Sequence, residues 1–190
     1  AAALGASGCA AKTTEVQRLQ ARAAYERGLA DLGENRTGAG LAGLREAAAL
    51  DGQVALYHNT LGKYLLNMKL PEPRAEAIGH FRRAVELEPV YADAHHSLGL
   101  AYNEESRWED AISEFRKALS IPTFSMPDLA YFNLGWALYS LGRFPEAEES
   151  LMLAIRLNPQ HPTLPAAYYT LGLVLVKQGR TEEDAPYRAG

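Results

Sequence analysis

The hydrophobic and polar positions between residues 91 and 118 follow the period of two short helices. On the first, Leu98 and Tyr102 lie four residues apart and share one face, and Gly99 leaves a gap beside Leu98. A polar stretch at residues 105–107 predicts a turn. The second helix carries one stripe in the order small, large, small: Ala111, Phe115 and Ala118. Because a gap opposite a bulky side chain lets two helices approach closely, we predict an antiparallel helical hairpin.

The same hairpin pattern recurs along the chain. In each copy a glycine follows the leucine of the first helix, and in a weaker first copy it follows Arg27. These glycines are 34 to 37 residues apart: Gly28, Gly62, Gly99, Gly135 and Gly172. The second-helix stripe recurs as Ala77, Phe81, Ala84 and as Ala147, Leu151, Ala154, with a degenerate version at Gly40, Leu44, Ala47. Such a period is typical of a solenoid of stacked helical pairs.

The spacing of Leu98-Gly99, Tyr102, Ala111 and Phe115 resembles the tetratricopeptide repeat, a unit of about 34 residues. His95 takes the place of the tryptophan in that pattern. The resemblance covers residues 21–190 and implies an all-α fold, a right-handed superhelical solenoid of antiparallel helix pairs. We expect about five units, the last incomplete: 21–54, 55–91, 92–127, 128–164 and 165–190.

The units differ in ways that carry structural expectations. Unit one is rich in glycine, which lowers helix preference, and should be the softest. Unit two has a three-residue excess near residues 70–73, which predicts a longer internal turn. Extra residues at 121–127 and 160–164 predict long linkers after units three and four. In unit five, a face carrying Leu171, Val174 and Leu175 lacks a complete covering helix; either the chain continues or a partner covers it.

Composition narrows the classes of function. The chain has 190 residues, 47% of them hydrophobic, which is enough to bury a core as one unit. Its net charge is −4. No basic stripe is present, so nucleic acid is not an expected partner. No run of 18 apolar residues exists that would predict a membrane-spanning helix.

The N-terminus predicts a membrane anchor of another kind. Residues 1–8 are small and uncharged, as in the last part of a secretory signal peptide. Ala6-Ser7-Gly8-Cys9 resembles a bacterial lipobox, although Ala6 stands where a large aliphatic residue is preferred. The resemblance implies an acylated Cys9, followed by a tether over residues 9–20. Because Ala10 is not Asp, it also implies the outer membrane, facing the periplasm. The alternative is a plain signal-peptide end with an incidental cysteine.

Catalytic and metal-binding patterns are not evident. His95 and His96 point about 100° apart on a helix, so they do not converge on one ion. His58 occupies the same repeat position as His95, which favours a structural role. The chain has no G-x-S-x-G, P-loop or H-E-x-x-H motif. We therefore expect no enzyme, no cofactor, no metal and no small-molecule substrate.

The tetratricopeptide resemblance implies that the first helix of each unit lines a concave groove that binds a protein. This geometry assigns the following residues to the groove: Tyr25, Leu56, Asn59, Lys63, His96, Leu100, Asn103, Leu129, Phe132, Trp136, Tyr139, Tyr169 and Leu173. Lys63 and Lys177 are the only cations along it, so a carboxylate clamp is not expected. An apolar groove with a few amides suits an amphipathic helix or an extended segment.

The helix of unit four is apolar on two sides. Leu129, Phe132, Trp136 and Tyr139 form one stripe, while Tyr131, Leu134 and Leu138 already supply a packing face. The extra stripe favours partner binding, and additional core burial remains the alternative.

Repeats, lipobox and length together resemble the pilotins of the type IV pilus secretin. Those outer-membrane lipoproteins help secretin subunits insert and multimerise. The resemblance implies a non-catalytic protein with a secretin partner and acyl chains in the membrane. Two alternatives stay open: a scaffold lipoprotein of β-barrel assembly or polysaccharide export, and a periplasmic enzyme or regulatory subunit, which would need a polar convergent site.

Overall fold

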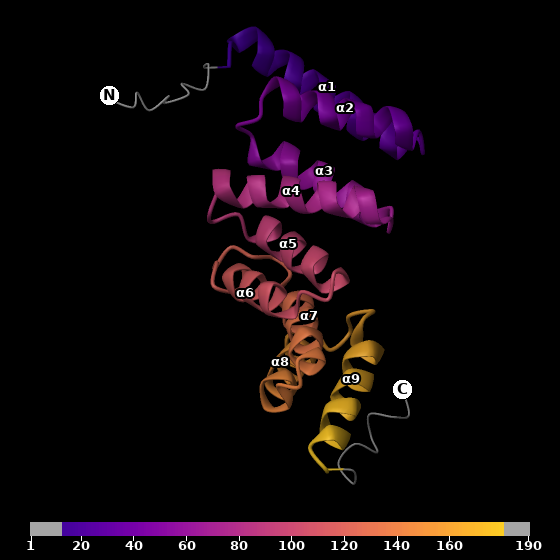
Figure 1. Cartoon of the computed structure of the whole chain (residues 1–190), viewed down its shortest axis with the longest axis vertical. Coiled ribbons are helices and arrows are strands. Elements are labelled where there is room, and N and C mark those ends of the chain that lie inside the picture. The colour runs from indigo at the N-terminus through magenta and orange to yellow at the C-terminus, as the bar shows by residue number, and fades with distance from the viewer. Residues whose placement is uncertain (1–12, 181–190) are drawn as a thin grey trace, which may run out of the picture. The chain divides into compact units, whose positions relative to one another are not determined.

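A computed structural model describes residues 13–180, and Cys9 with the predicted signal peptide lies outside that range. The chain divides into two compact units, Ala1–Tyr57 and His58–Gly190, which are described separately. Between residues 13 and 180 every regular element is a helix (Figure 1), which confirms the all-α prediction. The helices are α1 (Glu15–Gly33), α2 (Thr37–Leu50), α3 (Ala55–Asn67), α4 (Pro71–Leu87), α5 (Ala92–Glu104), α6 (Trp108–Leu119), α7 (Pro127–Ser140), α8 (Phe144–Leu157) and α9 (Leu164–Lys177).

The first unit pairs α1 with α2. Thr14 and Gln17 form a reciprocal capping box, in which the Thr14 hydroxyl accepts from the Gln17 backbone at 3.2 Å and the Gln17 amide oxygen accepts from the Thr14 backbone at 2.8 Å. The two helices touch backbone to backbone, because a Cβ on Gly43 would lie 2.8 Å from the Cα of Gly28. The glycines of this unit are therefore packing positions as well as poor helix formers.

In the second unit, each hairpin interlocks through a glycine and a bulky side chain. A Cβ added to Gly62 would lie 2.6 Å from the Phe81 ring, and one added to Gly99 would lie 2.6 Å from the Phe115 ring. Phe81 and Phe115 are fully buried. The predicted gap opposite an aromatic ring is thus confirmed, and it sets the distance between the helices of each pair.

The three extra residues of unit two do not lengthen the turn between its two helices, so the expectation of a longer internal turn was wrong. Only Met68, Lys69 and Leu70 separate α3 from α4, as many residues as separate α5 from α6. The extra residues lengthen α4, which has 17 residues against 12 in α6. Pro71 lies in the first turn of α4, where a missing N–H costs no helical hydrogen bond, so the helix begins at this proline rather than after it.

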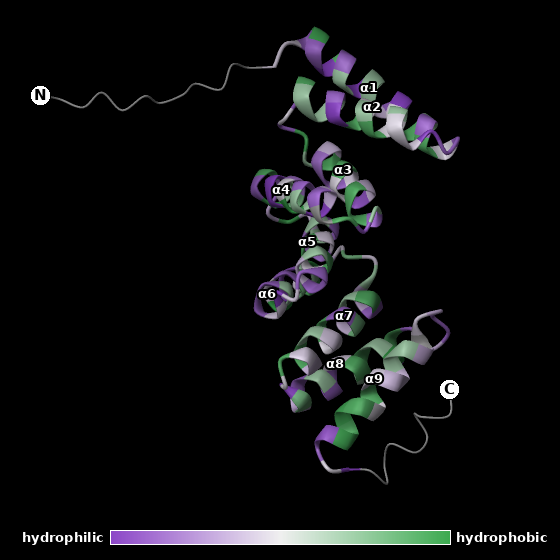
Figure 2. Cartoon of the chain, turned by 45° about the vertical axis from the view of Figure 1, so that its right-hand side comes forward, coloured by the Kyte–Doolittle hydropathy of each residue, from purple (hydrophilic) through white to green (hydrophobic). Residues whose placement is uncertain are grey.

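The last described helix is better covered than expected. Figure 2 shows α9 as a strongly hydrophobic helix. Leu171, Val174 and Leu175 are buried, each with 3% exposure or less, which corrects the expectation of an uncovered face.

The predicted linkers after units three and four are present. Residues 120–126 separate α6 from α7, and residues 158–163 separate α8 from α9. The first linker folds back into the core: Phe124 is buried in a cluster with Ala92, Ala118 and Ala130, and Met126 packs against that cluster.

Candidate protein-binding site

The predicted groove residues fall in both units. Tyr25 and Leu56 belong to the first: Tyr25 is half-buried with its ring 4.9 Å from that of Tyr57, and Leu56 is exposed. The other predicted residues belong to the second unit, and the site described below is built from that unit.

A pocket of about 200 Å³ opens between α3 and α5. It brings together three of the predicted groove residues, Lys63, His96 and Leu100. A fourth lining residue, Leu66 of α3, also lies on the helix face that the repeat pattern assigns to the groove. Sequence reasoning did not include the other side chains of the lining, which come from α3, α4, α5 and the 120–126 linker: Asn67, Phe81, Asp93, Ser97 and Met126. The linker contribution was not foreseeable from the repeat pattern, because the linker is an insertion relative to the 34-residue unit.

His96 forms part of the pocket wall and is held in place from several sides. Its ring lies 5.7 Å from the Phe115 ring and 5.6 Å from the Phe124 ring. His96 is buried at 6% exposure, and this burial lowers the pKa of its imidazole to about 4. The negative charge of Asp93 opposes the shift, and the positive charge of Lys63 reinforces it. The imidazole is consequently neutral at pH 7.

The hydrogen bonds around His96 also fix its tautomer. The Asn133 amide nitrogen donates to the Leu129 carbonyl at 2.9 Å and lies 3.4 Å from His96 Nε2. An amide nitrogen only donates, so Nε2 must accept and Nδ1 must carry the proton.

The predicted amides differ in accessibility. Asn59 is buried with 3% exposure and donates to the Tyr91 hydroxyl at 3.1 Å, while Asn103 is half-buried and donates to the Asn133 carbonyl at 3.3 Å. Neither Asn59 Oδ1 nor Asn103 Oδ1 has a hydrogen-bond partner within the described part of the chain. These amides connect neighbouring first helices, because Asn59 lies on α3 and Tyr91 precedes α5, whereas Asn103 joins α5 to α7.

The aromatic stripe of α7 is partly exposed. Trp136 has 39% of its surface exposed, and its ring lies 5.9 Å from that of Tyr139, which in turn lies 6.0 Å from the Phe144 ring of α8. Leu129 and Phe132 are half-buried. On α9, Tyr169 is 61% exposed and Leu173 is half-buried. Trp136 and Tyr169 therefore present large apolar surfaces that core packing does not use.

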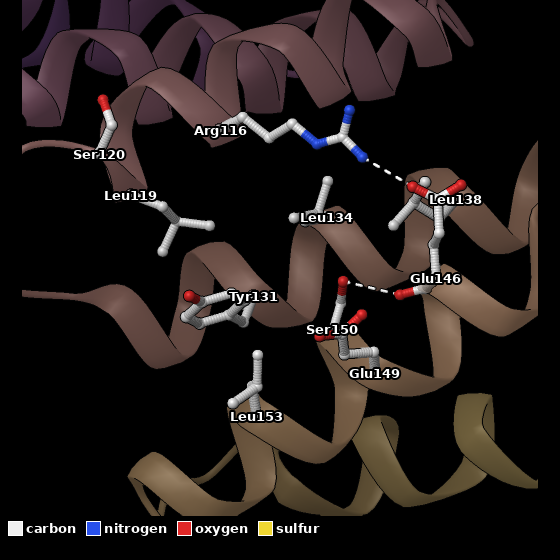
Figure 3. A pocket seen from close by; sticks show the side chains of 10 residues that line it. All are labelled: Arg116, Leu119, Ser120, Tyr131, Leu134, Leu138, Glu146, Glu149, Ser150 and Leu153. Carbon is white, nitrogen blue, oxygen red and sulfur yellow. Dashed lines mark hydrogen bonds and ion pairs between the residues drawn. The ribbon is translucent and has the colours of Figure 1, made fainter.

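A second hollow of about 370 Å³ lies against α6, α7 and α8 (Figure 3). Three of its polar side chains, those of Arg116, Glu146 and Ser150, already make hydrogen bonds. Arg116 donates to Glu146 at 2.8 Å, and the Ser150 hydroxyl donates to the Glu146 backbone carbonyl at 2.9 Å. This hollow is less suited to recognition than the α3–α5 pocket, since a ligand would compete with bonds that exist.

Two histidine contacts were missed by the sequence reading. His58 Nδ1 lies 2.9 Å from His80 Nδ1, and His95 Nδ1 lies 2.6 Å from Glu114 Oε2. The other His95 nitrogen donates to the Pro89 carbonyl at 3.0 Å. Burial alone would raise the pKa of Glu114, but hydrogen bonds from His95 and Lys117 outweigh it, so the pKa of Glu114 is lowered.

Both contacts pair a first helix with the second helix of its own hairpin, which explains why histidine recurs at this repeat position. Over residues 13–180, no three His, Cys, Asp or Glu side chains gather as metal ligands. Within the same range, no helix combines the length and hydrophobicity needed to span a bilayer.

Sequence comparison identifies repeats in the second unit. Tetratricopeptide repeat profiles match residues 74–125 and 129–161. The chain is 37% identical over 86 residues to protein O-mannosyl-transferase TMTC2 of Mus musculus, covering 45% of this chain and 10% of that protein. It is 30% identical over 106 residues to type IV pilus assembly protein PilF of Pseudomonas aeruginosa, covering 56% and 41%. The chain thus spans less than half the length of these relatives.

Solved structures share the fold. MamA superposes with a TM-score of 0.79 at 21% identity, covering 89% of this chain and 88% of MamA. Pseudomonas aeruginosa PilF gives 0.74 at 20% identity, covering 91% and 75%. PilW, a widely conserved type IV pilus biogenesis factor, gives 0.72 at 21% identity, covering 92% and 75%. The chain therefore has the fold of a tetratricopeptide solenoid.

Proposed function

We propose that this chain is a non-catalytic outer-membrane lipoprotein, a pilotin, of type IV pilus assembly. The surface formed by the first helix of each repeat unit binds secretin subunits. This binding promotes their insertion into the outer membrane and their multimerisation. The observation that carries the proposal is the partly exposed apolar surface of α7 and α9, with Trp136 39% and Tyr169 61% exposed, in a chain similar to a pilus assembly protein. Large aromatic side chains left partly exposed are typical anchors of protein interfaces.

Membrane attachment is the second part of the proposal. Acyl chains on Cys9 hold the solenoid at the inner leaflet of the outer membrane, because two or more chains give stable anchoring where one does not. Residues 10–14 then lead to α1, which begins at Glu15. The tether keeps the solenoid close to the membrane that secretin subunits enter.

The mechanism is stoichiometric. The solenoid shields an apolar secretin segment until neighbouring subunits replace it. Release needs only a higher affinity for the single subunit than for the finished ring. No covalent chemistry is required of the chain.

The α3–α5 pocket is lined by Ser97, His96 and Asp93, the three residue types of a catalytic triad. A nucleophile and its base must lie within hydrogen-bond reach. Within residues 13–180, no hydrogen bond joins Ser97 to His96 or His96 to Asp93, which favours recognition over catalysis.

A complementation experiment tests the proposal. In cells lacking the protein, we expect secretin to accumulate as monomers and multimers to be lost from outer-membrane fractions. Re-expression should restore the multimers, and Trp136→Ala should restore fewer of them than Met152→Ala, a change at a comparably exposed position on α8. Normal multimers without the protein would show that the proposal is wrong.

A further inference from the structure

We infer that the α3–α5 pocket receives one tyrosine side chain of the bound partner segment. This inference rests on the proposed function, because it names the chemistry by which that surface recognises its partner.

The size and walls of the pocket fit one aromatic ring. Its volume is about 200 Å³, and a protein cavity of about 150 Å³ holds benzene. A six-membered ring with one small polar substituent therefore fits. Four apolar side chains contribute to the walls: Leu66, Phe81, Leu100 and Met126.

The pocket also contains polar atoms that make no hydrogen bond within residues 13–180. Ser97 is 96% buried, at 4% exposure, and its hydroxyl has no hydrogen bond to any residue in the 13–180 range. His96 is similarly buried at 6% exposure, and its Nδ1–H is a donor for which residues 13–180 supply no acceptor. Neither Ser97 Oγ nor His96 Nδ1 is fully enclosed, so solvent reaches both atoms. A ligand that displaces this water gains affinity if it supplies a hydrogen bond in its place.

A phenol hydroxyl supplies the hydrogen bond that the Ser97 hydroxyl lacks. It accepts from one donor and donates to one acceptor, and the serine hydroxyl acts in either role. Phenylalanine would fill the apolar part and leave Ser97 without a partner.

The charges around the pocket favour a neutral ligand. Lys63 and Asp93 both line it, one positive and one negative, so their effects on a bound charge oppose each other. His96 adds no positive charge at pH 7, because it is neutral there. A carboxylate would face Asp93 and an ammonium would face Lys63, whereas a phenol meets neither penalty.

Ligand-observed and protein-observed NMR on the full chain tests the pocket without any partner. The probes are 4-methylphenol, which matches the tyrosine side chain, and toluene, which lacks the hydroxyl. A purely apolar cavity would prefer toluene, since the phenol loses its water on entry. We expect 4-methylphenol to bind at least about fivefold more tightly, a difference within reach of one net hydrogen bond, and to shift the resonances of Ser97 and Leu100.

Two variants sharpen the test. Ser97→Ala should abolish the preference for 4-methylphenol over toluene, and Ser113→Ala on the exposed face of α6 should leave it intact. Toluene binding as tightly as 4-methylphenol, shifts confined to another part of the chain, or an unchanged preference in Ser97→Ala would each overturn the inference.

The outcome can be separated from that of the proposed function. If the pocket prefers 4-methylphenol but secretin is not the partner, the pocket chemistry stands and the pilotin proposal falls. If secretin is the partner but replacing each tyrosine of the captured segment by phenylalanine leaves its affinity unchanged, the reverse holds.

Discussion

Single residues set how closely the helices of each hairpin pack. Gly99 touches the buried Phe115 ring so closely that even a methyl group has no room, with three ring carbons between 2.6 and 3.0 Å from a Cβ at that position. Gly79, in the middle of α4, has open space around it. Close packing therefore requires glycine at position 99, whereas position 79 has room for a larger side chain.

Replacing these two glycines by alanine should shift stability in opposite directions. Gly99→Ala should lower the free energy of unfolding by about 1–3 kcal/mol through overpacking, because the Phe115 ring is fully buried. Gly79→Ala should raise it by up to about 1 kcal/mol through helix preference. Urea unfolding measures both, and an equal stabilisation by the two changes would contradict the packing account.

His96 predicts a dependence of stability on pH. Its folded pKa of about 4 lies below the ordinary value of 6.5, so the unfolded chain binds the proton first as pH falls. Stability is thus fully present above pH 6.5 and declines between pH 6.5 and 4, by about 3 kcal/mol for a shift of this size.

Histidine NMR and urea unfolding check this expectation. The His96 signal should titrate near pH 4, and His96→Gln should remove most of the loss of stability between pH 6.5 and 5. A His96 signal that titrates near 6.5 would mean that the ring is not shielded by Phe115 and Phe124.

The sequence predicts residue contacts well where they repeat and poorly where they do not. The glycine–aromatic contacts recur with the period of the units, so spacing alone found them. The His95–Glu114 and His58–His80 contacts lie across a hairpin, and a sequence shows the two residues but not the distance between their side chains. The Met126 contribution to the pocket depends on an insertion that the repeat pattern does not describe.

At the scale of one element, α7 shows how a helix is divided between core and surface. Leu134 and Leu138 are buried at 5% and 1% exposure, while Trp136 between them is 39% exposed. The reading of this helix as apolar on two sides is consistent with these exposures. The partner-binding role of the exposed side stays a prediction.

Alanine substitutions on α7 should separate the two sides. Leu134→Ala should cost about 2–5 kcal/mol of unfolding free energy, as for a buried leucine. Trp136→Ala should cost about 1 kcal/mol, as for a typical point change, while weakening partner capture severalfold. Thermal unfolding and pull-down from membranes measure the two effects. A Trp136→Ala loss as large as that of Leu134→Ala would place Trp136 in the core instead.

Element boundaries were predictable except where extra residues had two places to go. The excess of unit two was absorbed by α4, which runs to 17 residues, because Pro71 is well placed in a first helical turn. The excess of unit three stayed outside the helices as the 120–126 linker. Composition alone does not decide between a longer helix and a longer loop when proline occurs in both.

For the whole molecule, the proposed anchor at Cys9 lies outside the helical repeats. Cys9 is six residues before Glu15, where α1 begins, so we expect its replacement to leave the fold intact. Cys9→Ala should therefore move the protein from the outer-membrane fraction to the soluble periplasm with an unchanged melting temperature. Immunoblots of fractionated cells check this, and persistent outer-membrane association of Cys9→Ala would contradict lipid anchoring.

The central claim is that the exposed aromatic surface of the second unit holds a secretin subunit. Photo-crosslinking in the native cell, with a photoreactive residue in place of Trp136 and a matched control in place of Met152, tests it most directly. The account predicts a secretin adduct from position 136 that is absent from position 152. An adduct with a β-barrel assembly or export component instead, or no adduct from position 136, would contradict it.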